Sequence, residues 1–237
     1  MHKVRKQTGI NKGPYRLEPL PPREAIKFFG KKVTLSAEDF YNLAASARAG
    51  AFTVSGVARA DVLNDIREAV QKALQDGETL ADFRGRLVDI MEQRGWSGTS
   101  PWHQETIFRT NIQTAYSAGR WEQIEQVKDD FCGEYDAIDD ARTTNICREL
   151  NGKIYPLDHP FWNKYTPPNH FNCRSSIRPV SKIEAEQRGL LPETGMPSSE
   201  IQPDKGFDVN PAKVQYKPDL SKYPDELRSL MASEGIK

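Results

Sequence analysis

The sequence predicts an α+β protein in which a helical N-terminal part precedes a small mixed α/β module, with extended N- and C-terminal arms. Apolar residues recur at helical spacing up to about residue 125. After Lys128 the chain becomes rich in aromatic residues, Pro and Asn, and both ends carry Pro-containing stretches. We therefore divide the chain into residues 1–32, a basic Pro-containing arm with a short helix; 33–128, a helical domain; 129–182, a small α+β module with a His/Cys cluster; and 183–237, an extended tail with a terminal helix.

Start and stop signals define the helices of the N-terminal part. Pro22 suits the first turn of a short helix that runs through Ala25 and Phe29, and Ser36 caps a helix expected over 37–49. Three longer amphipathic helices follow. Their signals are Gly77 as the stop of the first, Thr79 as N-cap and Gly95 as stop of the second, and Ser100 as N-cap before Pro101 in the third.

The segment after Lys128 predicts short strands around one short helix. We expect strands at 131–138, 152–156 and 175–180, and a helix over 141–150 that is capped by Asp139 or Asp140. Irregularly spaced aromatic residues in this segment favour a small core over a base-stacking platform. They are Tyr155, Phe161, Trp162, Tyr165 and Phe171.

Composition narrows the possible classes of protein. No run approaches the roughly 20 apolar residues of a membrane span, and no apolar segment follows the basic start, so we expect neither a membrane protein nor a secretory signal. A chain made in the cytoplasm with three cysteines is expected to hold reduced thiols or metal ligands instead of a disulfide framework.

The overall charge is zero, but the charges are segregated along the chain. Residues 1–32 contain nine Lys or Arg and two Glu, a net charge of plus seven, whereas residues 122–140 carry a net charge of minus seven. A basic arm can be a solvated surface, can bind an acidic protein surface, or can bind a nucleic acid through its phosphates. DNA binding through the first 32 residues therefore stays open as an alternative function.

The stretch PPNHFNCRSSIRP carries the side chains with the most chemistry. His170 and Cys173 have a spacing that lets both reach one Zn²⁺, and Cys147 lies 23 positions before His170, so the three residues are candidate ligands of a structural zinc ion. A fourth ligand is sought among three further residues: Asp140, Cys132 and His159. The alternative is packing, with both cysteines as small buried apolar residues and the histidine hydrogen-bonded to a backbone carbonyl.

Catalysis is a further alternative for the same residues. Cys173 paired with His170 or His159 would form a thiol–imidazole dyad, oriented by Asn169 or Asp158. A hydrolase or nuclease site would combine the cluster with Asp140, although a capping role is the simpler interpretation of that carboxylate. The sequence has no P-loop, no G-x-G-x-x-G and no H-E-x-x-H.

Several ordered elements resemble the phage Mu F-like minor head proteins, also called phage head morphogenesis proteins. The elements are Asp140-x-Arg142, Cys147, Asn151-Gly152, Pro167-Pro168 and His170-x-Asn172-Cys173-Arg174. Upstream stretches also look like the helical part of Mu-like members, so the resemblance covers about residues 18–180. The family commonly ends this motif Cys-Arg-Cys, whereas here Ser175 replaces the last cysteine and one possible ligand is lost.

The resemblance implies a structural role and no settled enzymatic activity. It implies a minor capsid protein of a tailed phage or prophage, made in the host bacterial cytoplasm and incorporated into the phage head. Such a protein would join the portal protein, and the major capsid protein or scaffold, during head assembly, and accompany DNA packaging or ejection. Arms that gain stability only on a partner's surface suit this role.

Overall fold

The computed structural model describes residues 22–213 except 44, 98 and 191. The first 21 residues of the basic arm and the terminal helix expected beyond residue 213 lie outside the described residues. Within the described ranges, no helix is long and apolar enough to cross a membrane.

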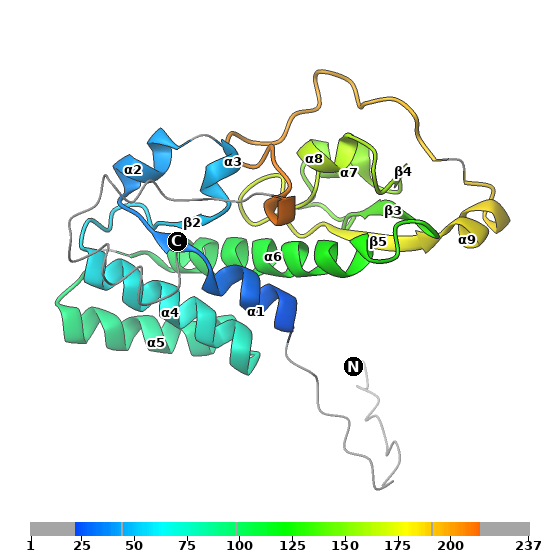
Figure 1. The fold of residues 1–237 in the computed structure, drawn as a ribbon. Helices are drawn as coiled ribbons and strands as arrows, with labels where there is room; N and C mark the ends of the chain where they lie inside the picture. The colour runs from blue at the N-terminus through cyan, green and yellow to red at the C-terminus, as the bar shows by residue number, and fades with distance from the viewer. Residues whose placement is uncertain (1–21, 44, 98, 191, 214–237) are drawn as a thin grey trace, which may run out of the picture.

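Helices form the N-terminal half, and two very short strands pair in parallel beside them (Figure 1). The elements in chain order are α1 (Arg23–Gly30), β1 (Val33–Thr34), α2 (Ala37–Asn42), α3 (Ala45–Arg48), β2 (Ala51–Phe52), α4 (Ala60–Asp76), α5 (Leu80–Arg94) and α6 (Pro101–Glu125). Helices α1, α4, α5 and α6 enclose one apolar core, whose buried side chains include Phe29, Ile66 and Phe83.

The capping signals of the three long helices are confirmed. Thr79 forms a reciprocal capping box with Asp82, which satisfies two free N–H groups at the start of α5. Gly77 and Gly95 end α4 and α5 with positive φ angles, and the Ser100 hydroxyl accepts from the His103 N–H at the start of α6.

The single helix expected over 37–49 was wrong, because the backbone becomes extended at Leu43 and separates α2 from α3. Two interactions outweigh helix propensity here. Leu43 packs against a small apolar cluster at the β1–β2 pair. Arg48 donates to the carbonyl oxygens of Leu43 at 3.1 Å and Tyr41 at 2.7 Å, which a break in the helix leaves without helical partners.

The C-terminal half is a three-stranded antiparallel sheet with short helices around it (Figure 1). Its strand order is β4-β3-β5, so β3 is central. The elements are β3 (Phe131–Asp136), α7 (Asn145–Leu150), β4 (Ile154–Pro156), α8 (Phe161–Lys164), β5 (Ser176–Ser181) and α9 (Lys182–Gln187). The three expected strands and the α+β class are confirmed.

The expected cap of the short helix was wrong. Helix α7 begins at Asn145 after Thr144, and neither Asp139 nor Asp140 caps it. Asp140 instead accepts two hydrogen bonds from the Arg174 guanidinium, at 2.6 and 2.8 Å. A bidentate Arg–carboxylate pair is stronger than a single capping bond, and it links this turn to the start of β5.

Aromatic side chains fill the core of the module as expected, with one exception. Tyr155 and Phe161 stack with ring centroids 3.9 Å apart, and Trp162 is buried beside them. Tyr165 is also buried, but Phe171 is 55% exposed and does not belong to this core.

The described part of the tail lies against the module instead of standing free. Asp204 N–H donates to the Asn169 carbonyl at 2.9 Å, and the Tyr165 hydroxyl donates to the Ile201 carbonyl at 2.9 Å. A 3₁₀ turn at Pro211–Lys213 then packs on α6. Composition alone gives no indication of these bonds, because they involve backbone groups.

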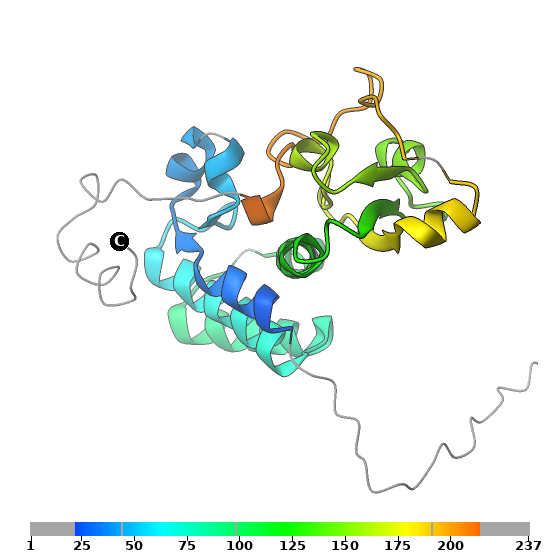
Figure 2. The ribbon, with the colours of Figure 1, turned by 45° about the vertical axis from the view of Figure 1, so that its right-hand side comes forward.

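Helix α6 is the wall shared by both halves, and Figure 2 looks almost along it. Its earlier residues, such as Ile107 and Ala115, belong to the helical core, whereas Trp121 and Ile124 belong to the core of the module. Helix α1 crosses α6 at Gly119, where a Cβ atom would lie 2.7 Å from the backbone nitrogen of Ala25.

We therefore predict that Gly119→Ala lowers the free energy of unfolding by about 1–3 kcal/mol, because the added methyl group forces α1 away from α6. This loss outweighs the gain of up to about 1 kcal/mol that alanine brings to a helix interior. Gly85→Ala in α5 is the matched control, since a Cβ there meets no atom within 4 Å. Urea unfolding should show that the control is at least as stable as the parent, and equal stability of both variants would contradict the tight crossing.

Candidate functional site

The three candidate ligands predicted from the sequence meet at one point. Cys147 comes from α7, and His170 and Cys173 come from the loop that precedes β5. The Cys147 Sγ lies 3.3 Å from His170 Nε2 and 3.8 Å from Cys173 Sγ, and the three ligand atoms all lie within 4.8 Å of one another. Both cysteines are buried and are free thiols.

Helix α6 holds the loop that carries two of these residues. Its Ser117 hydroxyl donates to the Pro167 carbonyl, and its Gln113 amide donates to the Ser175 carbonyl at 2.5 Å. The loop is therefore fixed to α6 on both sides of the cluster.

Asn172 shapes the turn between His170 and Cys173. It has a φ of 56°, a left-handed conformation that asparagine tolerates better than most residues, and the Cys173 N–H reaches back to the His170 carbonyl at 3.3 Å. Its side-chain amide donates to the Thr106 hydroxyl at 3.2 Å. The side chain thus stabilises a turn that brings both ligands to the same side.

The hydrogen bond on the far side of the His170 ring fixes its tautomer. Nδ1 lies 2.8 Å from the Phe171 carbonyl oxygen, which can only accept, so Nδ1 carries the proton. In the neutral ring Nε2 then presents its lone pair to Cys147 and to the Thr144 hydroxyl, 2.9 Å away. This is the arrangement in which histidine binds metal ions.

A buried chain of polar groups points at the Cys147 sulfur. The Asn169 amide donates to the Tyr135 hydroxyl oxygen at 2.8 Å, and that hydroxyl lies 3.2 Å from the sulfur. Because the Tyr135 oxygen already accepts one bond, its proton is free to point at the sulfur, which favours a thiolate.

The contact between the two thiols shifts the pKa values of Cys147 and Cys173 in opposite directions. A hydrogen bond from Cys173, followed by bonds from His170 and other neighbours, holds the pKa of Cys147 well below its usual range. The same interaction with Cys147, together with burial, raises the pKa of Cys173. The bond to Cys147 also raises the pKa of His170. The pair therefore favours a single negative charge, on Cys147.

The three residues considered as a fourth ligand lie elsewhere. Asp140 is paired with Arg174, and its pKa is lowered mainly by that hydrogen bond. Cys132 lies on β3 opposite Pro156 and Val180. His159 accepts from the Phe161 N–H at 3.1 Å and lies over the Tyr155 ring. Among the described residues, the group that could hold a metal ion contains Cys147, His170 and Cys173.

From the sequence, Ser175 was interpreted only as the loss of one possible ligand. In the structure Ser175 is 1% exposed, and its carbonyl oxygen accepts from the Gln113 amide at 2.5 Å. The available signal for a residue of the site was its position two residues after Cys173.

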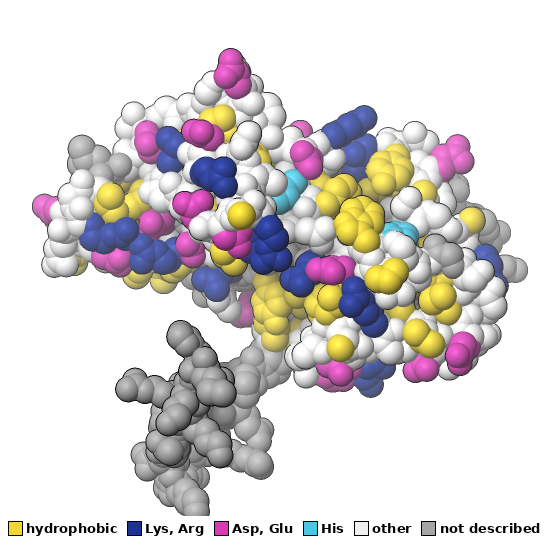
Figure 3. Space-filling view, turned by 180° about the vertical axis from the view of Figure 1, so that it is seen from behind, with side chains coloured by type: hydrophobic (Ala, Val, Ile, Leu, Met, Phe, Trp, Pro, Cys, Tyr) yellow, Lys and Arg dark blue, Asp and Glu magenta, His cyan; other side chains and the backbone are white. Residues whose placement is uncertain are grey.

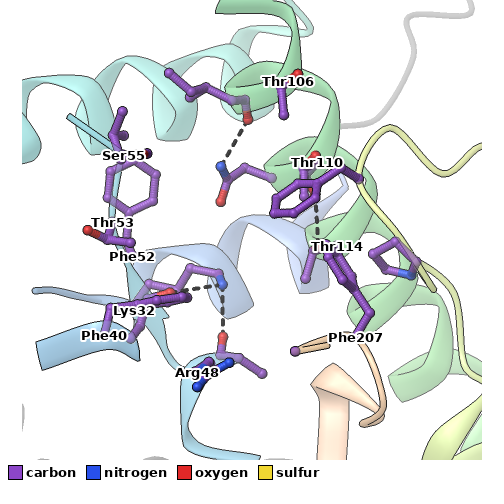
Figure 4. Close-up of a pocket in the computed structure, with 18 of the residues that line it drawn as sticks. Lys32, Phe40, Arg48, Phe52, Thr53, Ser55, Thr106, Thr110, Thr114 and Phe207 are labelled. Atoms are coloured by element: carbon purple, nitrogen blue, oxygen red, sulfur yellow. Dashed lines mark hydrogen bonds between the residues drawn. The ribbon is translucent and has the colours of Figure 1, made fainter. Parts of the chain in front are cut away.

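A cavity of about 580 Å³ is a second candidate site, which no motif in the sequence indicates. One wall is α6, with Thr106, Thr110 and Thr114 on successive turns, and the opposite wall is the segment from β1 to β2 (Figure 4). The charged lining residues within the described ranges are all cationic: Lys32, Arg48 and Lys205, with His103 beside them.

Lys32 lies on the floor of this cavity. Its ammonium group donates to the carbonyl oxygens of Ala49 at 2.8 Å and Ala51 at 3.3 Å (Figure 4). It also lies 5.2 Å from the centre of the Phe28 ring. Burial lowers the pKa of Lys32 to about 8.

The family model and the individual proteins that match this chain all refer to phage Mu protein F or proteins like it. Residues 64–178, from α4 to β5, match the family model described as "Phage Mu protein F like protein". The "Putative capsid assembly protein F" of Escherichia phage Mu is 32% identical over 215 residues, which cover 82% of this chain and 48% of that protein. The "Mu-like prophage FluMu F protein" of Haemophilus influenzae is 34% identical over 165 residues, which cover 64% of this chain and 40% of that protein.

The segment that contains the Cys/His cluster is therefore similar to a protein named for phage capsid assembly. Residues 64–178 match the phage Mu F-like family, which confirms the resemblance seen in the sequence. The chain spans about half the length, or less, of the curated relatives it matches. No solved structure shows significant similarity to it.

The buried amine of Lys32 predicts a measurable pH dependence. Because its pKa falls from 10.5 to about 8 on folding, the unfolded chain binds more protons between these pH values, and the free energy of unfolding rises with pH across that interval. The rise is at most about 3 kcal/mol for this group. Below pH 8 the amine is protonated in both states and contributes no pH dependence.

Urea unfolding between pH 7 and pH 10.5 tests this prediction, with Lys32→Met as the reference that lacks the amine. The parent should gain stability relative to the variant above pH 8. Parallel curves for the two proteins would show that Lys32 stays charged in the folded state.

Proposed function

We propose that this chain acts as a minor head protein of a tailed phage or prophage, at the portal or the inner capsid surface. The observation that carries the proposal is the similarity to a capsid assembly protein over 82% of the chain. In this role the chain is made in the cytoplasm of the host bacterium, becomes part of the virion, and contacts the portal protein and the major capsid protein or scaffold while the head assembles and DNA is packaged.

The cavity described above offers a surface for such a partner. Its rim carries three large aromatic side chains that are exposed: Trp102 at 69%, Tyr41 at 56% and Phe171 at 55%. In Figure 3, hydrophobic side chains gather over the half that contains the N-terminal helices, while charges of both signs are interspersed over the other half. Exposed aromatic groups around a preformed hollow are typical of a protein-binding surface.

The charges of the lining residues favour a partner with particular chemical groups. The cationic lining residues Arg48 and Lys205 favour carboxylates, and the aromatic rim favours apolar side chains. We therefore expect the occupant to be a segment of the portal protein that presents apolar side chains next to Asp or Glu.

Under this proposal the protein has a structural role in the phage head and no catalytic role. The relative from Escherichia phage Mu is named for capsid assembly. A hydrolase or nuclease site would need the Asp140 carboxylate beside the cluster, whereas this carboxylate is engaged by Arg174. DNA contact through the basic N-terminal residues remains a separate prediction, since residues 1–21 lie outside the described structure.

Copurification with the portal protein of the same phage tests the proposal. Trp102→Ala should weaken portal binding about tenfold or more, as loss of a central aromatic anchor usually does. Lys205→Glu should also weaken binding, and the parent's affinity should fall as salt is added.

Ile183→Ala is the matched control, because Ile183 is 68% exposed on α9 and does not line the cavity. The control should bind like the parent. Equal binding by Trp102→Ala would remove the cavity from the interface, and failure of the parent to bind portal, major capsid protein or scaffold would contradict the role in head assembly.

A further inference from the structure

We propose that Cys147, His170 and Cys173 bind one Zn²⁺ ion in a tetrahedral site, with an oxygen ligand at the fourth position next to Ser175. The ion would join α7 to the loop before β5. This inference is independent of the docking surface and of the role in head assembly.

Two of the three ligand separations are close to those of a tetrahedral zinc site, and the third, between His170 Nε2 and Cys173 Sγ, lies within 4.8 Å. With Zn–S bonds of about 2.3 Å and Zn–N bonds of about 2.05 Å, tetrahedral angles separate two sulfurs by about 3.8 Å and a sulfur from a nitrogen by about 3.6 Å. The Cys147–Cys173 sulfurs are 3.8 Å apart, and Cys147 Sγ lies 3.3 Å from His170 Nε2. A disulfide would require sulfurs about 2.05 Å apart, so the two thiols are not covalently joined and both are available to a cation.

Groups around the cluster hold each ligand in its metal-binding form. The Phe171 carbonyl keeps the proton of His170 on Nδ1. The Asn169 amide donates to the Tyr135 hydroxyl, which lies 3.2 Å from the Cys147 sulfur. Such outer hydrogen bonds orient ligands and stabilise thiolates in known metal sites. Simple packing of two apolar cysteines does not call for polar groups beside the sulfur.

The fourth ligand of the ion would lie next to Ser175. Ser175 is buried and follows Cys173 by two residues on the stretch that leads into β5. Because it is so near a candidate ligand in the same loop, we place the fourth donor atom at this position. Serine supplies oxygen in place of sulfur, either from its own hydroxyl or from a water that it holds.

The ion would neutralise the charge of the two thiolates. It would also cross-link two segments of the chain. Two buried thiolates together with Zn²⁺ are neutral, whereas two thiolates alone repel each other in a low-dielectric environment. The ligands lie 23 and 26 residues apart in sequence, so the ion would restrict a loop that contains β4 and α8. Metal affinity in such a site contributes directly to folding stability.

The first experiment uses the full chain purified with reductant and no added chelator. Elemental analysis should find one zinc ion per chain. Replacement by Co²⁺ should give the intense visible bands of a tetrahedral site and near-ultraviolet sulfur-to-cobalt charge transfer, and a chelator should lower the midpoint of thermal unfolding. Less than one-tenth of an ion per chain, with no tetrahedral spectrum after Co²⁺ is added, would overturn the proposal.

Variants then assign the ligands. Cys147→Ser should lose the metal, whereas Cys132→Ser should keep it, because the third cysteine lies on β3 outside the cluster. Ser175→Cys should raise the charge-transfer intensity by about half, since three thiolates replace two. An unchanged intensity would show that Ser175 does not face the ion.

The outcomes remain interpretable if a variant does not fold. The cobalt spectrum of the parent reports on coordination without any substitution, and the Ser175→Cys variant adds a ligand instead of removing one. A metal that stays bound in Cys147→Ser would overturn the assignment. None of these measurements depends on binding to the portal protein, so failure here and failure of the proposed function are distinguishable.

Discussion

The close approach of α1 to α6 at Gly119 is the constraint on which the two halves of the molecule depend. A glycine lets the two backbones meet, so α6 can be covered by helices on one side and still expose its other side to the module. On the same helix, Ala115 packs in the core of the helical half, and Trp121 packs in the core of the module. A single rigid helix of 25 residues therefore sets the geometry of both halves. The sheet needs only three strands because α6 already supplies a wall.

The module is stabilised by specific polar contacts as much as by its apolar core. Buried tyrosine, asparagine and serine groups converge on the cysteines, and Arg174 links the turn at Asp140 to the strand that follows the cluster. Polar networks of this kind are costly when incomplete, because each buried group left without a partner loses its hydration. Because these buried polar groups all surround the cysteines, the cluster is the part of this small module with the most polar contacts. The small sheet alone buries little surface.

Local signals in the sequence were sufficient for the three long helices and for choosing Cys147, His170 and Cys173 as candidate ligands that lie together. Caps such as Thr79 and stops such as Gly95 act within one helical turn, so their effect can be deduced from neighbouring residues. The failures all involve partners that are distant in sequence. Asp140 was expected to cap a helix but pairs with Arg174, 34 positions away, and the helix expected over 37–49 breaks because Leu43 packs on strands from either side of it. The cavity was missed for the same reason, since its walls come from segments far apart in the chain.

The cavity and the Cys/His cluster share structural members. Thr106 and Thr110 line the cavity, and their hydroxyls also hold Asn172, the residue whose left-handed turn sets His170 and Cys173 side by side. An occupant that drew these hydroxyls toward itself would compete with Asn172 for them and would loosen the turn. Occupation of the hollow and order at the cluster would in that way be thermodynamically linked, so each would report on the other across the width of one helix.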